Sequence, residues 1–251
     1  MAAGELPDGR EWTVSLGEAT ERLKDRHGIP RERQDLFALR SQTLAADAWM
    51  QGRYAPWTVT VPGTTLTRDE TVREGTTLEG LAGLRTVFRA VGEGGTVTAG
   101  NASPMSDGAS AVLIGSESAA AILDRVPLAR VAGRAAAANE PQFFGYAPVI
   151  AANHALKRAG ISWDDVGAVE LNEAFAAQSL ACIDDWPINP EIVNRWGGAI
   201  AIGHPLGASG GRVLGTLAAR LHHEGAQYGV ATLCIGVGQA LAVVLERTLD
   251  A

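Results

Sequence analysis

The chain has 251 residues, of which 46% are hydrophobic and 20% charged, proportions that are ordinary for a folded protein with a sizeable core. Its 21 basic and 28 acidic residues give a net charge of −7, which argues against a nucleic-acid partner, because contacts with phosphates need a basic surface. The apolar runs are far too short to cross a membrane, and the first residues lack a secretory signal. We therefore expect a globular cytoplasmic protein. Two cysteines are too few for a disulfide framework or a four-cysteine metal site, so we expect no metal.

Two helices are predicted near the start of the chain. Ser15 followed by Glu18 three residues later has the spacing of a capping box and predicts a helix over residues 15–27. Leucine and alanine at near-helical spacing predict a second helix over residues 31–51.

Residues 53–100 are rich in threonine, glycine and proline, which indicates an elaborated loop region with short β-prone pieces at 57–61 and 97–99. Beyond residue 106, strand-like and helix-like segments alternate with short connections. This alternation predicts a layered α/β fold. The predicted elements are a buried strand at 109–115, a helix from Ser116, a strand at 128–132, a helix at 148–160, a strand at 166–171, a helix ending near 183, a helix at 208–224 and strands at 230–234 and 239–245.

The chemistry-bearing residues lie in four short motifs. One histidine, His204, stands in a glycine-rich run, and one cysteine, Cys234, stands just before two further glycines. An imidazole can titrate near neutral pH, and a thiol can move a proton, so this pair suits chemistry on thioesters. The motifs are Asn194-Arg-Trp-Gly-Gly-Ala-Ile-Ala-Ile-Gly-His-Pro-Leu-Gly-Ala-Ser-Gly-Gly-Arg212, Leu233-Cys-Ile-Gly-Val-Gly-Gln239, Val169-Glu-Leu-Asn-Glu-Ala-Phe175 and Gly100-Asn-Ala-Ser103.

Together these motifs resemble the thiolase family, the acetyl-CoA acyltransferases, over essentially the whole chain. The resemblance implies a thiolase-like layered α/β fold. Residues 1–105 would be a loop domain that covers coenzyme A, 106–126 a strand–helix remnant of the N-terminal domain, and 127–251 a complete C-terminal domain. The family's nucleophilic cysteine belongs to an N-terminal region that we do not find here, so we expect the N-terminal half to be largely absent.

The resemblance also assigns catalytic roles. His204 would be the general base that removes a thiol proton and a donor to the thioester oxyanion, and Asn172 would hold the water that acts with it. Cys234 would be the general acid/base, and the backbone N–H of Gly236 would belong to a second oxyanion hole.

Four further residues would contact the substrate. Ala102 would contact coenzyme A, Ser103 would lie near its pantetheine and Phe88 beside its adenine end, and Phe175 would line the acyl or pantetheine pocket. Coenzyme A thioesters would be substrates, and no cofactor would be bound permanently.

Each motif also has a purely structural explanation. His204 could cap a helix from a turn, Cys234 could be an inert core residue, and Asn172 could be a helix N-cap. Cys182 lies in the middle of a predicted helix, and we interpret it as structural. The G-x-S-x-G pattern around Ser209 would suit a hydrolase, but the histidines that follow it lie on a helix with no acid placed between.

Two functional hypotheses remain. The first is a thiolase that cleaves 3-ketoacyl-CoA reversibly into acyl-CoA and acetyl-CoA. The second is a non-catalytic C-terminal subunit that needs a partner chain. A two-step mechanism requires a covalent nucleophile, and neither Cys182 nor Cys234 matches the one in the family. We therefore expect the isolated chain to be inactive, and to associate with itself as a homo-oligomer or with a complementing N-terminal thiolase chain.

Overall fold

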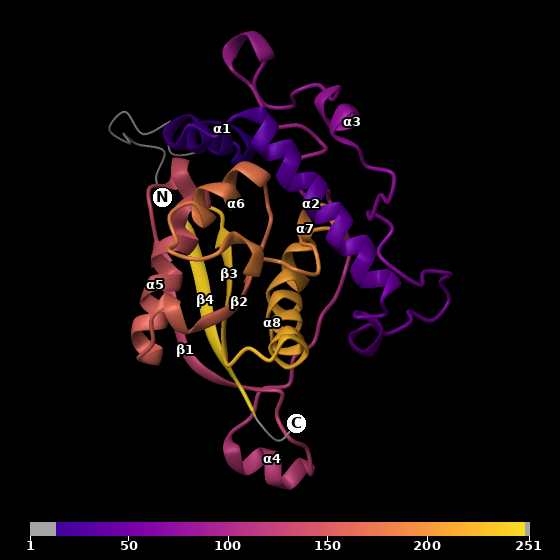
Figure 1. Ribbon diagram of the computed structural model, residues 1–251, viewed down its shortest axis with the longest axis vertical. Coiled ribbons are helices and arrows are strands. Elements are labelled where there is room, and N and C mark those ends of the chain that lie inside the picture. Colours follow the sequence, from indigo (N-terminus) through magenta and orange to yellow (C-terminus); the bar gives the residue numbers. More distant parts are fainter. Residues whose placement is uncertain (1–13, 249–251) are drawn as a thin grey trace, which may run out of the picture.

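A computed structural model describes residues 14–248, and within that range it contains one four-stranded sheet (Figure 1). The strands are β1 (Ala129–Ala138), β2 (Val166–Leu171), β3 (Tyr228–Ile235) and β4 (Gln239–Arg247). Their order across the sheet is β1-β4-β3-β2, in which β2 and β3 are parallel and the other two pairs are antiparallel. The strands predicted near residues 166, 230 and 239 therefore share one sheet, as expected, and the strand predicted at 128–132 is the beginning of β1.

Helices surround this sheet. They are α1 (Leu16–His27), α2 (Arg31–Met50), α3 (Leu78–Ala82), α4 (Glu117–Leu123), α5 (Ala147–Ala159), α6 (Ala176–Ile183), α7 (Ala199–Ile202) and α8 (Leu206–Glu224). The predicted helices are all present, and the Ser15 hydroxyl caps α1 by accepting a hydrogen bond from the Glu18 N–H. Within residues 14–248, no helix combines the length and the apolar character that crossing a membrane requires.

The sheet is covered on both faces. Because side chains alternate along a strand, neighbouring residues of β2 and β3 enter different cores. Val169 and Val230 pack in the core that includes the apolar side of α5, whereas Ala168 and Ala231 pack in a second core with Leu217 of α8. Figure 1 shows α5 and α8 on opposite sides of the strands. This layered α/β arrangement agrees with the predicted fold class.

The segment predicted as a buried strand at 109–115 is not a strand. It runs without regular secondary structure, and its apolar side chains are exposed, with Leu113 82% and Ile114 70% accessible. No strand of the described chain lies beside it, so its backbone has no ladder to join. A hydrogen bond from the Ser110 hydroxyl to the Ala208 carbonyl, at 2.7 Å, ties it to the start of α8.

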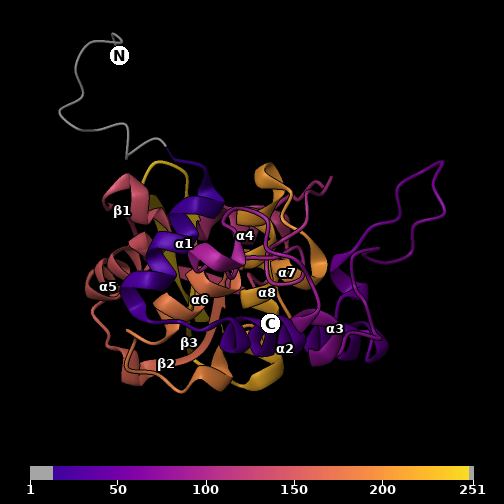
Figure 2. The same cartoon turned by 90° about the horizontal axis from the view of Figure 1, so that it is seen from above.

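The loop region predicted over residues 53–100 contains the short helix α3 and differs in detail from expectation. Residues 57–61 form no strand and are exposed, and 97–99 contribute only an isolated bridge between Thr98 and Thr86. Figure 2 shows the chain between α2 and α3 reaching away from the body of the protein. A strand needs paired neighbours as well as β-prone residues. Residues 57–61 belong to no ladder, and 97–99 pair at a single bridge.

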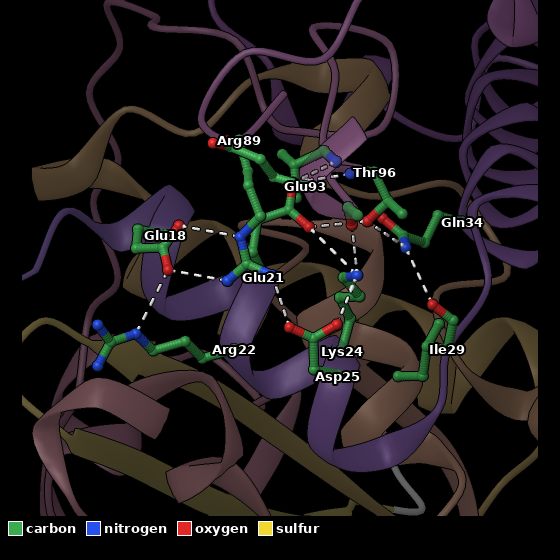
Figure 3. A network of polar contacts seen from close by, with 12 residues as sticks. Glu18, Glu21, Arg22, Lys24, Asp25, Ile29, Gln34, Arg89, Glu93 and Thr96 are labelled. Atoms are coloured by element: carbon green, nitrogen blue, oxygen red, sulfur yellow. Dashed lines mark hydrogen bonds and ion pairs between the residues drawn. The ribbon is translucent and has the colours of Figure 1, made fainter. Parts of the chain in front are cut away.

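A polar network fastens the later part of this loop region to α1 (Figure 3). The buried carboxylate of Glu21 accepts hydrogen bonds from the N–H groups of Thr96 and Val97 at 2.8 and 2.9 Å. Lys24 donates to the carbonyl of Gly94 at 2.6 Å, and Arg89 pairs with two acidic residues of α1. These contacts fix residues 89–97 in position although they contain little regular structure.

Candidate functional site

The proposed site begins where β2 ends. The N–H of Asn172 donates to the carbonyl of Thr232 on β3 at 3.0 Å, so the first residue after β2 is still held by the sheet. The side chain of Asn172 is 1% exposed, and its Nδ2 lies 3.2 Å from Nε2 of His204. Two residues that are 32 positions apart, and that the motifs singled out separately, are therefore in contact.

His204 lies in the turn between α7 and α8. Its neighbour Gly203 has φ +82°, and a Cβ there would overlap the Ser106 hydroxyl, so this turn requires glycine. Arg212, one of the residues on α8, donates to the Gly203 carbonyl at 2.8 Å. Burial, together with the nearby positive charge of Arg212, holds the pKa of His204 below the ordinary histidine value. The imidazole is therefore kept in its neutral, proton-accepting form.

The second ring nitrogen of His204 contacts Ser209. The Nδ1 atom lies 2.6 Å from the Ser209 hydroxyl, which in turn donates to the Pro205 carbonyl at 3.0 Å. The hydrolase hypothesis was rejected from the histidines that follow Ser209, whereas the histidine that contacts Ser209 is His204, which precedes it. A nucleophile must reach its substrate, however, and Ser209 is completely buried. The contact is therefore not a hydrolase dyad.

Cys234 is the penultimate residue of β3. It is 7% exposed and belongs to a small apolar cluster with Ala19, Phe144 and Ala174. Since Ala174 comes two residues after Asn172, the cysteine packs against the loop that carries Asn172. Burial raises the pKa of the Cys234 thiol to about 12, so the thiol carries its proton near neutral pH. Its catalytic role stays a prediction.

Gly236 lies in the turn that joins β3 to β4. Its φ is not in the left-handed region, and a Cβ at this position would meet no heavy atom within 4 Å. Packing among the described residues therefore places no demand for glycine at this position. Its predicted role as an oxyanion-hole donor stays open.

The four residues expected to contact coenzyme A converge. Ala102 forms an isolated antiparallel bridge with Phe175, and the N–H and hydroxyl of Ser103 both donate to the Ala174 carbonyl at 3.0 Å. The rings of Phe88 and Phe175 meet edge to face, with centroids 6.2 Å apart. The loop after Asn172 is therefore shared by the predicted catalytic and substrate-binding residues.

Sequence reasoning gave no role to the buried carboxylate of Glu173. It accepts hydrogen bonds from the Ser41 hydroxyl at 2.6 Å, the Asn194 amide at 2.8 Å and the N–H of Ile200 at 3.2 Å. A Cβ at Gly198 would overlap this carboxylate, which explains one of the glycines in the run before His204. The sequence offered one signal for this role: Asn194, which donates to the carboxylate, is the first residue of the glycine-rich motif.

Cys182 agrees with its structural interpretation. It is fully buried in α6, and its thiol donates to the Gly145 carbonyl at 3.2 Å. Burial raises the pKa of this thiol well above its usual value. Among residues 14–248, no group of three or more His, Cys, Asp or Glu is arranged to hold a metal ion.

Known family models match most of the chain. The model described as "Thiolase, N-terminal domain" matches residues 10–118, and the one described as "Thiolase, C-terminal domain" matches residues 125–247. The expectation that the N-terminal half is largely absent is not supported, because the residues interpreted as a separate loop domain and a remnant match the model of that domain.

Curated relatives and solved structures agree with these models. The 3-ketoacyl-CoA thiolase of Photobacterium profundum is 48% identical over 242 residues, which are 92% of this chain and 62% of that protein. The 3-ketoacyl-CoA thiolase of Escherichia coli is 46% identical with the same coverage. A crystal structure of human mitochondrial 3-ketoacyl-CoA thiolase in complex with CoA has a TM-score of 0.87 at 36% identity, covering 95% of this chain and 60% of that one. The chain thus spans about three fifths of the length of the relatives it matches.

Proposed function

Because the chain belongs to the thiolase family, we propose that it carries the acid–base and oxyanion-binding part of a 3-ketoacyl-CoA thiolase site. The reaction is the reversible cleavage of 3-ketoacyl-CoA by coenzyme A into acyl-CoA and acetyl-CoA. One observation carries the proposal: the contact between Asn172 and His204 at the loop on which Phe175 meets Phe88. The names of the relatives support the substrate class, coenzyme A thioesters. That no cofactor is bound permanently stays an expectation.

The role of each group in the reaction follows from its protonation state near neutral pH. Neutral His204 removes the proton from the attacking thiol through Nε2 and then donates that proton in a hydrogen bond to the thioester oxygen. Asn172 holds a water against the same oxygen. Cys234, a thiol at neutral pH, exchanges a proton with the α-carbon or the leaving thiol, and the N–H of Gly236 stabilises the second oxyanion.

The substrate lies along the loop after Asn172. Ala102 and Ser103 contact the pantetheine, Phe88 borders the adenine end and Phe175 lines the acyl or pantetheine pocket. Their mutual contacts support a common binding surface. The polar network fastens the segment that begins directly after Phe88 to α1 (Figure 3).

The nucleophile comes from outside these 251 residues. A thiolate is the form that attacks, and burial disfavours it at both Cys182 and Cys234. We therefore expect the chain to need a second segment or partner chain that supplies the reactive cysteine. The exposed apolar residues between 109 and 115 offer a surface for such an association, or for self-association. The alternative is a subunit that only assembles and does not react.

The test compares the purified chain with the chain co-expressed with an N-terminal thiolase segment that carries the nucleophilic cysteine. Thiolysis of acetoacetyl-CoA is followed as release of acetyl-CoA, and native mass spectrometry reports the assembly. We expect no turnover by the chain alone and recovery in the complex. In that complex His204→Ala should lower kcat/KM by roughly a thousandfold or more, and His154→Ala, on the exposed side of α5, should not.

The other possible outcomes decide between the thiolase and the non-catalytic subunit. Robust turnover by the pure chain would show that Cys182 or Cys234 is the nucleophile. A complex that assembles without turnover would favour the non-catalytic subunit. The cytoplasmic location expected from the sequence stays a prediction.

A further inference from the structure

Ser209 is a completely buried hydroxyl in the first turn of α8 with two partners. Its Oγ lies 2.6 Å from Nδ1 of His204 and 3.0 Å from the carbonyl oxygen of Pro205. A serine hydroxyl has one proton to donate and lone pairs that accept. The carbonyl can only accept, so the bond to Pro205 uses the hydroxyl proton. While the hydroxyl makes that bond, Oγ accepts from Nδ1, and Nδ1 carries the ring proton.

The opposite side of the ring leads to the same tautomer. The amide Nδ2 of Asn172, a donor, lies 3.2 Å from Nε2 of His204. A protonated Nε2 would place two donors against each other, so the neutral ring presents its lone pair there. In this amide orientation the Asn172 contact matches the tautomer that the Ser209 contact indicates, with Nδ1 protonated and Nε2 basic.

We propose that Ser209 is a positioning residue that keeps Nδ1 of His204 protonated throughout the reaction, so that Nε2 is the only nitrogen that gains and loses a proton. The proposal deepens the function proposed above and rests on it. When Nε2 takes the proton of the attacking thiol, the ring becomes an imidazolium whose Nδ1–H still donates to Ser209. When Nε2 returns the proton, the same neutral tautomer is restored.

Asn172 alone would not hold this tautomer. Its Oδ1 has no hydrogen-bond partner among the described residues, so the amide can turn over without breaking another bond. After such a turn Oδ1 would accept from a protonated Nε2. For Ser209 to donate to Nδ1 instead, its hydroxyl would have to give up the hydrogen bond to the Pro205 carbonyl.

The direct experiment is nitrogen NMR of the chain labelled with ¹⁵N at its histidine rings. The sequence has five histidines, and the His204→Gln variant identifies the signals of interest. At a pH where the ring is neutral, we expect Nδ1 of His204 to show the shift and one-bond coupling of a protonated nitrogen, and Nε2 the shift of an unprotonated one. Ser209→Ala should convert this into a mixture of tautomers or into the Nε2–H form, and Ser209→Thr should restore the Nδ1–H form.

Ser110→Ala is the matched control. It removes a hydroxyl that donates to the carbonyl of Ala208, next to Ser209, without contacting the ring. We expect it to leave the tautomer unchanged. Far-UV circular dichroism checks that each variant folds. The unsubstituted chain tests the proposal even if Ser209→Ala does not fold, because an Nε2–H tautomer of His204 in that chain would overturn it.

An activity arm uses the chain complemented with its nucleophile-bearing segment. Ser209→Ala should lower kcat by roughly 10- to 100-fold, the usual effect of removing the partner that orients a functional histidine, with KM nearly unchanged. A loss of kcat with the tautomer intact would mean a merely structural role and would contradict the proposal. If none of the complemented enzymes catalyses thiolysis, the proposed function fails. The tautomer measurement still tests whether Ser209 keeps Nδ1 of His204 protonated.

Discussion

The side-chain amide of Asn194 donates a hydrogen bond to the buried carboxylate of Glu173 at 2.8 Å. This bond joins the loop after β2 to the start of the glycine-rich run that contains His204. The same carboxyl group also accepts from the Ser41 hydroxyl and the N–H of Ile200, so one buried side chain ties three separate segments together. Burial raises the pKa of Glu173, and these three donors oppose that rise by favouring the charged form.

Replacing this carboxylate by an amide should weaken the fold. In Glu173→Gln, one oxygen becomes an NH₂ group that faces donors only, so we expect unfolding to become easier by about 3 kcal/mol, as for a lost hydrogen bond to a buried charge. Urea unfolding measures the change. Glu74→Gln is the control, because that exposed carboxylate pairs only with Arg68 in the described chain, and its effect should stay within about 0.5 kcal/mol. Equal effects of the two substitutions would contradict the role given to Glu173.

Elements with a local signal were predictable from sequence. The Ser15 cap and the left-handed Gly160 after α5 are encoded within a few residues of the helix ends, and both helices have the expected bounds. The strand predicted at 109–115 was wrong for a physical reason. Its run of small and apolar residues indicates burial, but a strand also needs a neighbour, and pairing is decided by segments remote in the sequence.

The site was predictable to a similar extent. Asn172 and His204 were predicted from their motifs, and they are in contact. The roles of Ser209, Arg212 and Asn194 were missed although all three lie in the quoted glycine-rich run. Whether a polar side chain in a turn or a helix reaches a ring nitrogen, a carbonyl or solvent depends on the three-dimensional course of the turn, which the spacing of residues does not determine.

A second prediction concerns the pH dependence of stability at the buried pair of Glu170 and Arg220. Arg220 is fully buried and donates to Glu170 at 2.7 Å, to Glu224 at 2.8 Å and to the carbonyls of Val169 and Ile192. Burial raises the pKa of Glu170 to about 7, and the positive charge of Arg220 limits that rise. Removing the arginine should raise the pKa further.

For a carboxyl whose folded-state pKa is raised, the folded state binds more protons than the unfolded state. Stability is therefore lost as pH rises from the unfolded value, near 4.3, through the folded one. Arg220→Met should cost about 3–5 kcal/mol at neutral pH, as expected for an uncompensated buried charge, and less at pH near 5. Urea unfolding at both pH values tests this. The double variant Glu170→Gln, Arg220→Met should lose most of the extra pH dependence, and a persistent dependence would point to another group.

A third prediction separates charge from geometry at Arg212. Its charge, second to burial, lowers the pKa of His204, and its guanidinium also holds the Gly203 carbonyl. Because the base acts in its neutral form, a lowered pKa extends activity to lower pH. Arg212→Gln should raise the pKa of His204 and move the acidic limb of the pH–rate profile upward, whereas Arg212→Lys should keep more of the lowering. A proton NMR titration of His204 gives the same answer without activity, and an unchanged titration in Arg212→Gln would exclude the charge effect.

The last prediction uses two glycines of the β3–β4 turn that differ in what they require. Gly238 has φ +81°, and a Cβ there would overlap the carbonyl of Asn139, whose N–H donates to the Gly238 carbonyl at 2.7 Å. Gly236 has no such constraint, since its φ is not in the left-handed region and the space around its would-be Cβ is open. Backbone conformation and packing therefore require glycine at 238. They do not require it at 236, where the predicted role in the oxyanion hole would supply the reason.

Gly236→Ala should fold normally, with stability unchanged or raised by up to about 1 kcal/mol, because alanine restricts the unfolded chain at a compatible position. Gly238→Ala should cost more than about 1 kcal/mol, since alanine at positive φ is strained and the methyl group meets backbone. In the complemented enzyme, Gly236→Ala should nevertheless lower kcat/KM by roughly 10-fold or more if its N–H faces the thioester oxygen, because the methyl group enters the space that the substrate needs. Thermal unfolding and thiolysis assays measured on the same preparations separate the two effects. A Gly236→Ala enzyme that is both stable and fully active would remove this residue from the oxyanion hole.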